Sequence, residues 1–149
     1  MKILLVCTSG GHFATMKYLE PFWSHHERVW VTDHKKDTEE LNKRNEKVYW
    51  LSYQGPREIM PFLANIPRSL GIIAKEKPDL IISTGASIAV NFSLSARIFG
   101  KRFIFVESIT RSKELSLSAK LVYFFCNELY VQWPDLPTKY PKAMFKGYV

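Results

Sequence analysis

Short apolar runs alternate with longer, partly polar segments along most of the chain. Six runs are continuously apolar or rich in β-branched and aromatic residues, which predicts strands covered on both faces of a sheet. These runs are residues 2–7, 28–32, 47–51, 79–83, 102–107 and 128–132. The segments between them predict helices over residues 13–24, 37–45, 57–76, 87–99 and 113–125.

The last part of the sequence follows a different pattern. Pro134, Pro137 and Pro141 predict an extended connection, which we expect to be followed by one short strand. Strands that alternate with helices favour right-handed crossovers and an open parallel sheet. We therefore expect one α/β domain over residues 1–149, with about six to seven strands and helices on both faces of the sheet.

Three loops gain importance from this architecture. Ligands of open parallel sheets bind beyond the carboxyl ends of the strands. The rule brings together loops that are distant in the sequence, at residues 8–12, 84–87 and 107–111. We expect a ligand-binding crevice between these three loops.

The charge of the chain favours an anionic partner. Twenty-one Lys and Arg residues against fourteen Asp and Glu residues give a net charge of +7. This charge suits nucleic acid, an anionic membrane surface or a phosphorylated substrate, and does not choose among them. Two Cys and four His residues match no zinc-binding spacing, so we expect no metal site. No apolar run has the length of a secretory signal or a membrane span.

The first loop reads CTSGGHFATM from Cys7 to Met16 and follows the first predicted strand. It lacks the lysine and hydroxyl with which a Walker A loop reaches phosphate and magnesium. It also lacks the third glycine of a dinucleotide-binding turn, so no nucleotide cofactor is expected. Backbone N–H groups of residues 9–12 at the start of a helix still suit an anion.

Two side chains of this loop compete for a chemical role. Cys7 ends an apolar strand as in low-molecular-weight tyrosine phosphatases, but Phe13 replaces the arginine that grips phosphate. A thiol in such a position is more often an inert core residue. His12 remains, since a neutral imidazole near pH 7 accepts a proton from an attacking hydroxyl. The alternative for His12 is that it only begins the helix.

Five short motifs, in order along the chain, resemble one family of proteins. They are SGGH from residue 9, STG from residue 83, ES at 107 with a basic residue after it, SLSAKLVY from 116 and VQWP from 131. Together they resemble the acceptor-side subunit of split glycosyltransferases. That Alg family includes the eukaryotic subunit of dolichol-oligosaccharide synthesis and PssD-like bacterial subunits of capsule and exopolysaccharide assembly. The resemblance implies the amino-terminal, Rossmann-like half of a GT-B glycosyltransferase.

The resemblance also implies a division of labour between two chains. This chain would bind a polyprenyl-diphosphate-linked saccharide, and a donor-binding subunit would hold the UDP-sugar. Transferase activity is then expected only when both subunits are assembled. The reaction implied needs no metal, and the sequence contains no Asp-x-Asp pair that would hold one. The implied location is the cytoplasmic face of a membrane, as a peripheral protein.

At matching positions, the resemblance assigns catalytic roles to His12 and Glu107. His12 would be the general base or an acceptor-binding residue, and Glu107 would orient His12 or bind an acceptor hydroxyl. A glutamate at the end of a strand is equally suited to bind backbone amides at the next helix. The acceptor-binding residues implied are Ser9, Gly10, Gly11, Thr84, Gly85, Ser108 and Arg111. An arginine at the last of these positions can grip a diphosphate with two parallel hydrogen bonds.

Residues 55–78 are the candidate for a membrane contact. Their apolar residues recur at helical spacing, and basic residues beside them outnumber acidic ones. The residues expected at the membrane are Arg57, Phe62, Ile66, Arg68 and Lys75. The alternative is a crossover helix whose apolar stripe packs on the sheet.

Aromatic residues gather near the end of the sequence, at Trp133, Tyr140, Phe145 and Tyr148. Aromatic side chains are favoured anchors of protein interfaces, so we expect this region to contact the donor-binding subunit. Two other functions compete with the transferase subunit. A stand-alone nucleotide-binding enzyme would need the missing glycine motif, and a nucleic-acid-binding domain would need basic residues that are less dispersed.

Overall fold

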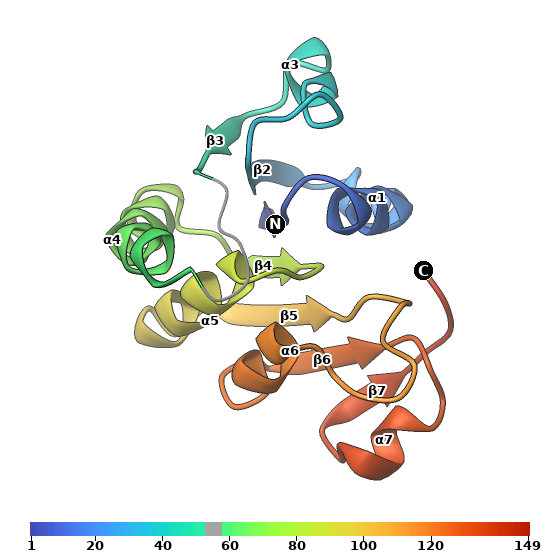
Figure 1. Cartoon of the computed structure of the whole chain (residues 1–149). Coiled ribbons are helices and arrows are strands. Elements are labelled where there is room, and N and C mark those ends of the chain that lie inside the picture. The colour runs from blue at the N-terminus through green and yellow to red at the C-terminus, as the bar shows by residue number, and fades with distance from the viewer. Residues whose placement is uncertain (53–57) are drawn as a thin grey trace.

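A computed structural model describes residues 1–52 and 58–149, and an open sheet forms its centre (Figure 1). Seven parallel strands lie in the order β3-β2-β1-β4-β5-β6-β7. Their bounds are β1 Lys2–Val6, β2 Glu27–Thr32, β3 Val48–Trp50, β4 Leu80–Ser83, β5 Arg102–Val106, β6 Glu128–Val131 and β7 Ala143–Phe145. The prediction of an open parallel sheet of six to seven strands is confirmed.

Helices cover both faces of this sheet. Their bounds are α1 Gly11–Tyr18, α2 Glu20–Trp23, α3 Glu40–Lys43, α4 Ile59–Glu76, α5 Ile88–Ile98, α6 Leu117–Val122 and α7 Leu136–Lys139. The helices α1, α2 and α3 share one apolar core with the sheet, and α4 to α7 share the other. Figure 1 shows α4 and α5 next to each other, with α1 on the opposite side of the sheet.

The strand β1 lies in the middle of the sheet and is covered on both faces. Ile3 and Leu5 belong to the core beneath α1 and α2, whereas Leu4 and Val6 belong to the core beneath α5. All four side chains are fully buried. Because successive side chains of a strand point to opposite faces, burial on both faces requires the continuous apolar run seen in the sequence.

Three elements differ from the sequence-based expectations. The helix expected over residues 13–24 is divided at Leu19 into α1 and α2, because Pro21 has no N–H with which to continue the first helix. The helix α6 begins only after Ser116, whose hydroxyl caps it by accepting from the amide of Ala119 at 3.1 Å. The connection expected to be extended contains α7, with Pro137 in its first turn, where a missing N–H costs nothing.

A cluster of charges lies at the amino ends of the strands. The Glu76 side chain, only 2% exposed, contacts the ammonium groups of Lys2 and Lys47, each at 2.8 Å. Its carboxylate also accepts a hydrogen bond from the hydroxyl of Tyr49. Burial alone would raise the pKa of Glu76, but the bonds from Lys2, Lys47 and Tyr49 outweigh it and lower that pKa to about 2.

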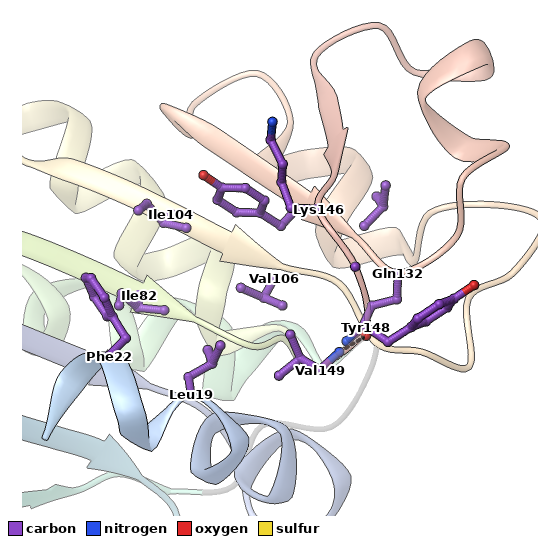
Figure 2. A pocket seen from close by; sticks show the side chains of 12 residues that line it. Leu19, Phe22, Ile82, Ile104, Val106, Gln132, Lys146, Tyr148 and Val149 are labelled. Carbon is purple, nitrogen blue, oxygen red and sulfur yellow. Dashed lines mark hydrogen bonds between the residues drawn. The ribbon is translucent and has the colours of Figure 1, made fainter.

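The face of the sheet that carries α1 and α2 is not covered over its whole width. A groove of about 270 Å³ lies over the ends of β4, β5 and β6, with Ile82, Ile104 and Val106 among the side chains that line it. Leu19 and Phe22 of the α1–α2 region and residues 146–149 also line this groove, as Figure 2 shows. We call it the second groove. It is mostly apolar and open.

Candidate functional site

A crevice of about 700 Å³ opens at the carboxyl ends of β1, β4 and β5. The order of the strands reverses between β1 and β4, and ligands of such sheets bind at this switch point. The crevice is lined by Thr8, Ser9, Gly11, His12, Glu58, Ile59, Phe62, Ala86, Ser87, Val90, Glu107, Ser108, Thr110, Arg111, Ser116, Leu117, Ser118 and Leu121. The prediction that three distant loops form one crevice is therefore confirmed.

His12 is held in a defined orientation in the first turn of α1. Its Nδ1 lies 2.8 Å from the carbonyl oxygen of Thr84. A carbonyl only accepts hydrogen bonds, so Nδ1 carries the proton and, in the neutral ring, Nε2 keeps its lone pair. The hydroxyl of Thr84 in turn donates to the carbonyl oxygen of His12 at 2.6 Å. These two bonds join β4 to α1 and leave Nε2 as the proton-accepting atom.

Gly85 makes room for the imidazole. A Cβ atom added to Gly85 would lie 2.5 Å from both Cε1 and Nδ1 of His12, and the glycine has a φ of +132°. Only glycine adopts such a backbone easily and permits so close an approach. Thr84 and Gly85 were predicted to bind the acceptor. In the structure both contact the ring of His12 and are not among the residues that line the crevice, so their binding of the acceptor stays a prediction.

Two aspartates that the sequence analysis did not single out hold the SGG turn. Asp33 is buried and accepts from the amide of Ser9 at 2.7 Å and from its hydroxyl at 2.8 Å. Asp37 accepts from the amide of Gly10 at 2.6 Å. Two amides of the turn are thus already bonded, so an anion at this helix start has Gly11 and His12 to bind. Asp33 follows β2, and the rule about carboxyl strand ends applied to that strand would have found it.

Glu107 acts on the backbone of its own loop. One carboxylate oxygen accepts from the amide of Ser108 at 2.9 Å, and the other accepts from the amide of Ser116 at 2.8 Å. The side chain is only 1% exposed. The carbonyl of Thr84 holds Nδ1 of His12, and the bonds of Glu107 run to backbone amides; a role of Glu107 in orienting His12 or in binding an acceptor hydroxyl stays a prediction. The alternative from the sequence, a glutamate tied to the amides at the next helix, describes the observed bonds.

Ser108 and Arg111 reach the crevice from this same loop. The hydroxyls of Ser108 and Thr110 lie 2.9 Å apart, and the amide of Arg111 donates to the carbonyl oxygen of Ser108 at 3.0 Å. The Arg111 side chain is exposed and, among residues 1–52 and 58–149, no ion pair engages its guanidinium. Among the described residues that line the crevice, Arg111 is the one Lys or Arg side chain, and it suits an anionic ligand.

One side of the crevice is apolar. Ile59 and Phe62 come from α4, Val90 comes from α5, and Leu117 and Leu121 come from α6. Ile59, Leu117 and Leu121 are 69%, 58% and 46% exposed. The sequence analysis quoted the SLSAKLVY motif but gave it no place in the site. The crevice therefore combines polar side chains such as that of His12 with apolar side chains from α4, α5 and α6.

The residues expected at a membrane are distributed differently from the prediction. Phe62 and Ile66 are partly buried, and Phe62 packs against the core, whereas Arg68 and Lys75 are exposed. Arg57 lies outside the described residues. The large apolar side chains of α4 that are exposed are Ile59, Met60 and Leu63. In the described part of the chain, no helix has the length and hydropathy needed to span a membrane.

The structure also bears on the role of Cys7 and on metal binding. Cys7 is fully buried, and burial raises the pKa of its thiol far above the usual range, which suits a core residue and not a nucleophile. Within the described ranges, no three His, Cys, Asp or Glu side chains gather as metal ligands would.

The parallel sheet and the crevice at its switch point define a Rossmann-like domain of the kind found in GT-B glycosyltransferases and related epimerases. MurG from Acinetobacter baumannii shares this fold over 91% of the chain, with a TM-score of 0.70 and 16% identity. The match covers 43% of the MurG chain.

The sequence model of the family described as "Oligosaccharide biosynthesis protein Alg14 like" matches residues 3–149, and the chain belongs to this family. The UDP-N-acetylglucosamine transferase subunit ALG14 of Yarrowia lipolytica is 30% identical over 98% of the chain and 80% of its own length. The protein of the same name from Rattus norvegicus is 36% identical over 66% of the chain and 46% of its own length. The chain thus matches about half the length of its mammalian relatives.

Proposed function

We propose that this chain is the acceptor-binding subunit of a two-component glycosyltransferase that acts on a polyprenyl-diphosphate-linked saccharide. The observation that carries the proposal is the crevice, which combines an oriented imidazole, an exposed arginine and apolar side chains. The relatives named above are transferase subunits for UDP-N-acetylglucosamine, which supports this sugar nucleotide as the donor. The family description supports oligosaccharide biosynthesis, whereas a role in capsule or exopolysaccharide assembly stays a prediction.

The polar and apolar side chains of the crevice match the two ends of such an acceptor. The diphosphate would lie near Arg111 and the amides of Gly11 and His12, where a guanidinium and a helix start favour negative charge. The first part of the lipid chain would leave between α4 and α6, along Phe62 and Leu121. This arrangement places the acceptor sugar beside His12.

His12 then serves as the general base of the transfer. Nε2 accepts the proton of an acceptor hydroxyl while the oxygen of that hydroxyl forms a bond to the anomeric carbon of the UDP-sugar. The bond between that carbon and the phosphate oxygen breaks, and UDP leaves with the electron pair. The hydrogen bond from Nδ1 to the carbonyl of Thr84 selects the tautomer in which Nε2 holds the lone pair, and the same bond can persist in the imidazolium that forms. Ser9, Gly10, Thr84, Gly85 and Glu107 position the loops and the ring.

The second groove supports a place for the donor-binding subunit. Its apolar floor is formed by β4, β5 and β6, and Tyr148 on its rim is 62% exposed. Lys146 and Tyr148 in Figure 2 stand along one side of the groove. An exposed aromatic residue beside an open apolar surface is typical of a protein interface. This location agrees with the region that the aromatic residues of the sequence indicated.

A membrane surface is proposed at the α4 side of the crevice. Ile59, Met60 and Leu63 are 69%, 76% and 51% exposed in the first turns of α4. Apolar side chains edged by basic residues such as Arg68 lie readily in the headgroup layer of anionic lipids. A peripheral position at the cytoplasmic face would bring the mouth of the crevice to the lipid-linked acceptor.

Reconstitution of the transfer tests the proposed function. The full chain and the donor-binding subunit that co-purifies with it are mixed with UDP-N-acetylglucosamine and polyprenyl-diphosphate-linked N-acetylglucosamine. We expect a disaccharide product only when both chains are present, measured by separation of the labelled lipid. Each chain alone is the control. Full activity of this chain by itself, or no product from the assembled pair, would contradict the proposal.

A further inference from the structure

Two neighbouring side chains at the end of β6 hold the crevice loop by its backbone. The side-chain amide of Gln132 donates to the carbonyl oxygen of Glu107 at 3.2 Å, and the indole Nε1 of Trp133 donates to the carbonyl oxygen of Ile109 at 2.7 Å. Gln132 is buried, with 1% of its surface exposed. The loop held in this way carries Ser108 and Arg111 into the crevice. The QW pair of the VQWP motif therefore acts on the wall of the candidate site.

The same two side chains contact the segment that borders the second groove. The amide oxygen of Gln132 accepts from the backbone N–H of Val149 at 2.6 Å, a bond that Figure 2 shows. The ring of Trp133 lies edge-on to that of Tyr148, with centroids 6.1 Å apart. A side-chain amide has one oxygen and one nitrogen, and here the oxygen serves Val149 while the nitrogen serves Glu107. Its orientation is therefore fixed by both partners together.

Gln132 thus lies between the second groove and the crevice. It lines the second groove, and its amide nitrogen bonds to the loop that lines the crevice. We propose that Gln132 and Trp133 are positioning residues, through which residues 146–149 set the geometry of Ser108 and Arg111 for acceptor binding. This inference rests on the proposed function. The inference also implies that a partner bound in the second groove would alter acceptor affinity. Such a partner would contact residues 146–149 and Gln132, which support the loop that carries Ser108 and Arg111.

Calorimetric titration of the full chain with farnesyl diphosphate, a soluble isoprenyl diphosphate, tests the inference. The variant Trp133→Phe keeps an aromatic ring beside Tyr148 but removes the donor to Ile109. We expect its dissociation constant to rise about 3- to 10-fold, the change that corresponds to one hydrogen bond, with an unchanged number of sites. A merely structural defect would lower the number of sites and leave the dissociation constant unchanged.

Trp50→Phe is the matched control. Trp50 ends β3, stacks edge-on to His34 with centroids 4.7 Å apart, and lines neither the crevice nor the second groove. We expect it to leave the dissociation constant unchanged. An equal dissociation constant in wild type and Trp133→Phe, or an equal rise in both variants, would overturn the inference and leave the proposed function intact. A wild-type chain that does not bind farnesyl diphosphate would instead overturn the proposed function.

A second variant keeps the test decisive if Trp133→Phe does not fold. Tyr148 is mostly exposed, so Tyr148→Leu removes the ring contact at little risk to the fold. We expect a rise of about 2- to 3-fold in the dissociation constant, consistent with the loss of an aromatic pair. Tyr18→Leu removes a tyrosine that is 73% exposed and lines neither the crevice nor the second groove, and serves as its control. No difference between these two variants would also overturn the inference.

Discussion

The amino and carboxyl ends of the parallel strands use polar residues in different ways. At the amino ends, the buried Glu76 is surrounded by Lys2, Lys47 and Tyr49, so that charged groups satisfy one another. At the carboxyl ends, Glu107 is bonded to backbone amides, and within residues 1–52 and 58–149 only Nδ1 of the His12 ring is hydrogen-bonded. In the first arrangement the charged side chains bind one another. In the second, Nε2 of His12 can bind a ligand. We infer that the amino ends mainly contribute stability and the carboxyl ends mainly contribute function.

The direction of the helices explains part of this contrast. The first residues of α1 and α6 line the crevice, where the positive end of a helix favours anions. Glu76 is the last residue of α4, where the helix end is negative and a carboxylate is disfavoured. The two lysines beside it offset this repulsion. The helix ends at the amino ends of the strands therefore favour cations such as the two lysines. The helix ends at the carboxyl ends of the strands favour an anionic ligand.

The largest effect is expected from His12→Asn. The amide of asparagine can still donate to the carbonyl of Thr84, but it is no base, so kcat of the assembled enzyme should fall about 100- to 10,000-fold. The free energy of unfolding should change by less than about 1 kcal/mol. Steady-state kinetics and urea denaturation measure the two quantities.

His34→Asn is the control for this substitution. His34 is exposed beyond β2 and does not line the crevice. We expect the rate to stay within about 2-fold of wild type, as for an exposed residue away from the chemistry. A similar loss of rate in both variants, or an unfolded His12→Asn protein, would break the contrast between the two ends.

The second effect concerns Glu76→Gln and its dependence on pH. Because the folded-state pKa of Glu76 is lowered from 4.5 to about 2, its ionised form stabilises the fold above pH 4.5. This stabilisation is lost as the pH falls from about 4.5 towards 2. We expect the variant to lose about 3 kcal/mol at pH 7 and less at pH 3, measured by urea denaturation.

The acceptor affinity of the folded Glu76→Gln protein should remain unchanged, since Glu76 does not line the crevice. Titration with farnesyl diphosphate at pH 7 measures it. A stability difference that is the same at pH 3 and pH 7 would show that the charge of Glu76 is not the source of the effect. A loss of affinity would show that the two ends are not independent.

The smallest effect tests the proposed membrane contact of α4. The helix α4 has 18 residues and is about 27 Å long, with Leu63 near the crevice end and Lys75 near the other. We expect Leu63→Glu to lower sedimentation with anionic vesicles about 10-fold, because an apolar side chain is lost from the lipid. Lys75→Glu should lower it by about 5-fold or less. A larger effect at Lys75 would contradict a membrane at the mouth of the crevice.

The sequence predicted the frame of the site better than its internal contacts. Apolar runs and the rule about carboxyl strand ends were enough to bring residues 8–12, 84–87 and 107–111 together, because burial and crossover geometry depend on local patterns. The bond between His12 and Thr84 joins residues 72 positions apart, and no periodicity reports such a pairing. Only the folded chain shows that Gly85 lies against the imidazole.

Glu107 and α4 show where residue type was ambiguous. A glutamate after a strand suits catalysis and amide capping alike, and the distances to Ser108 and Ser116 show the capping, while a catalytic role stays a prediction. The apolar stripe of α4 suited both a membrane and the core. Ile72 and Ile73 are buried in the later turns, so that part of α4 packs in the core, while Met60 in the first turn is exposed, and a membrane contact there stays a proposal.

The two outermost strands limit how this molecule can join another protein. β3 and β7 have three residues each, so each offers few unpaired backbone groups to a neighbouring strand. Extension of the sheet across subunits would gain little from such short borders. Assembly with another chain must then depend on side-chain surfaces, and its specificity would be open to change by single substitutions without disturbing the backbone of the sheet.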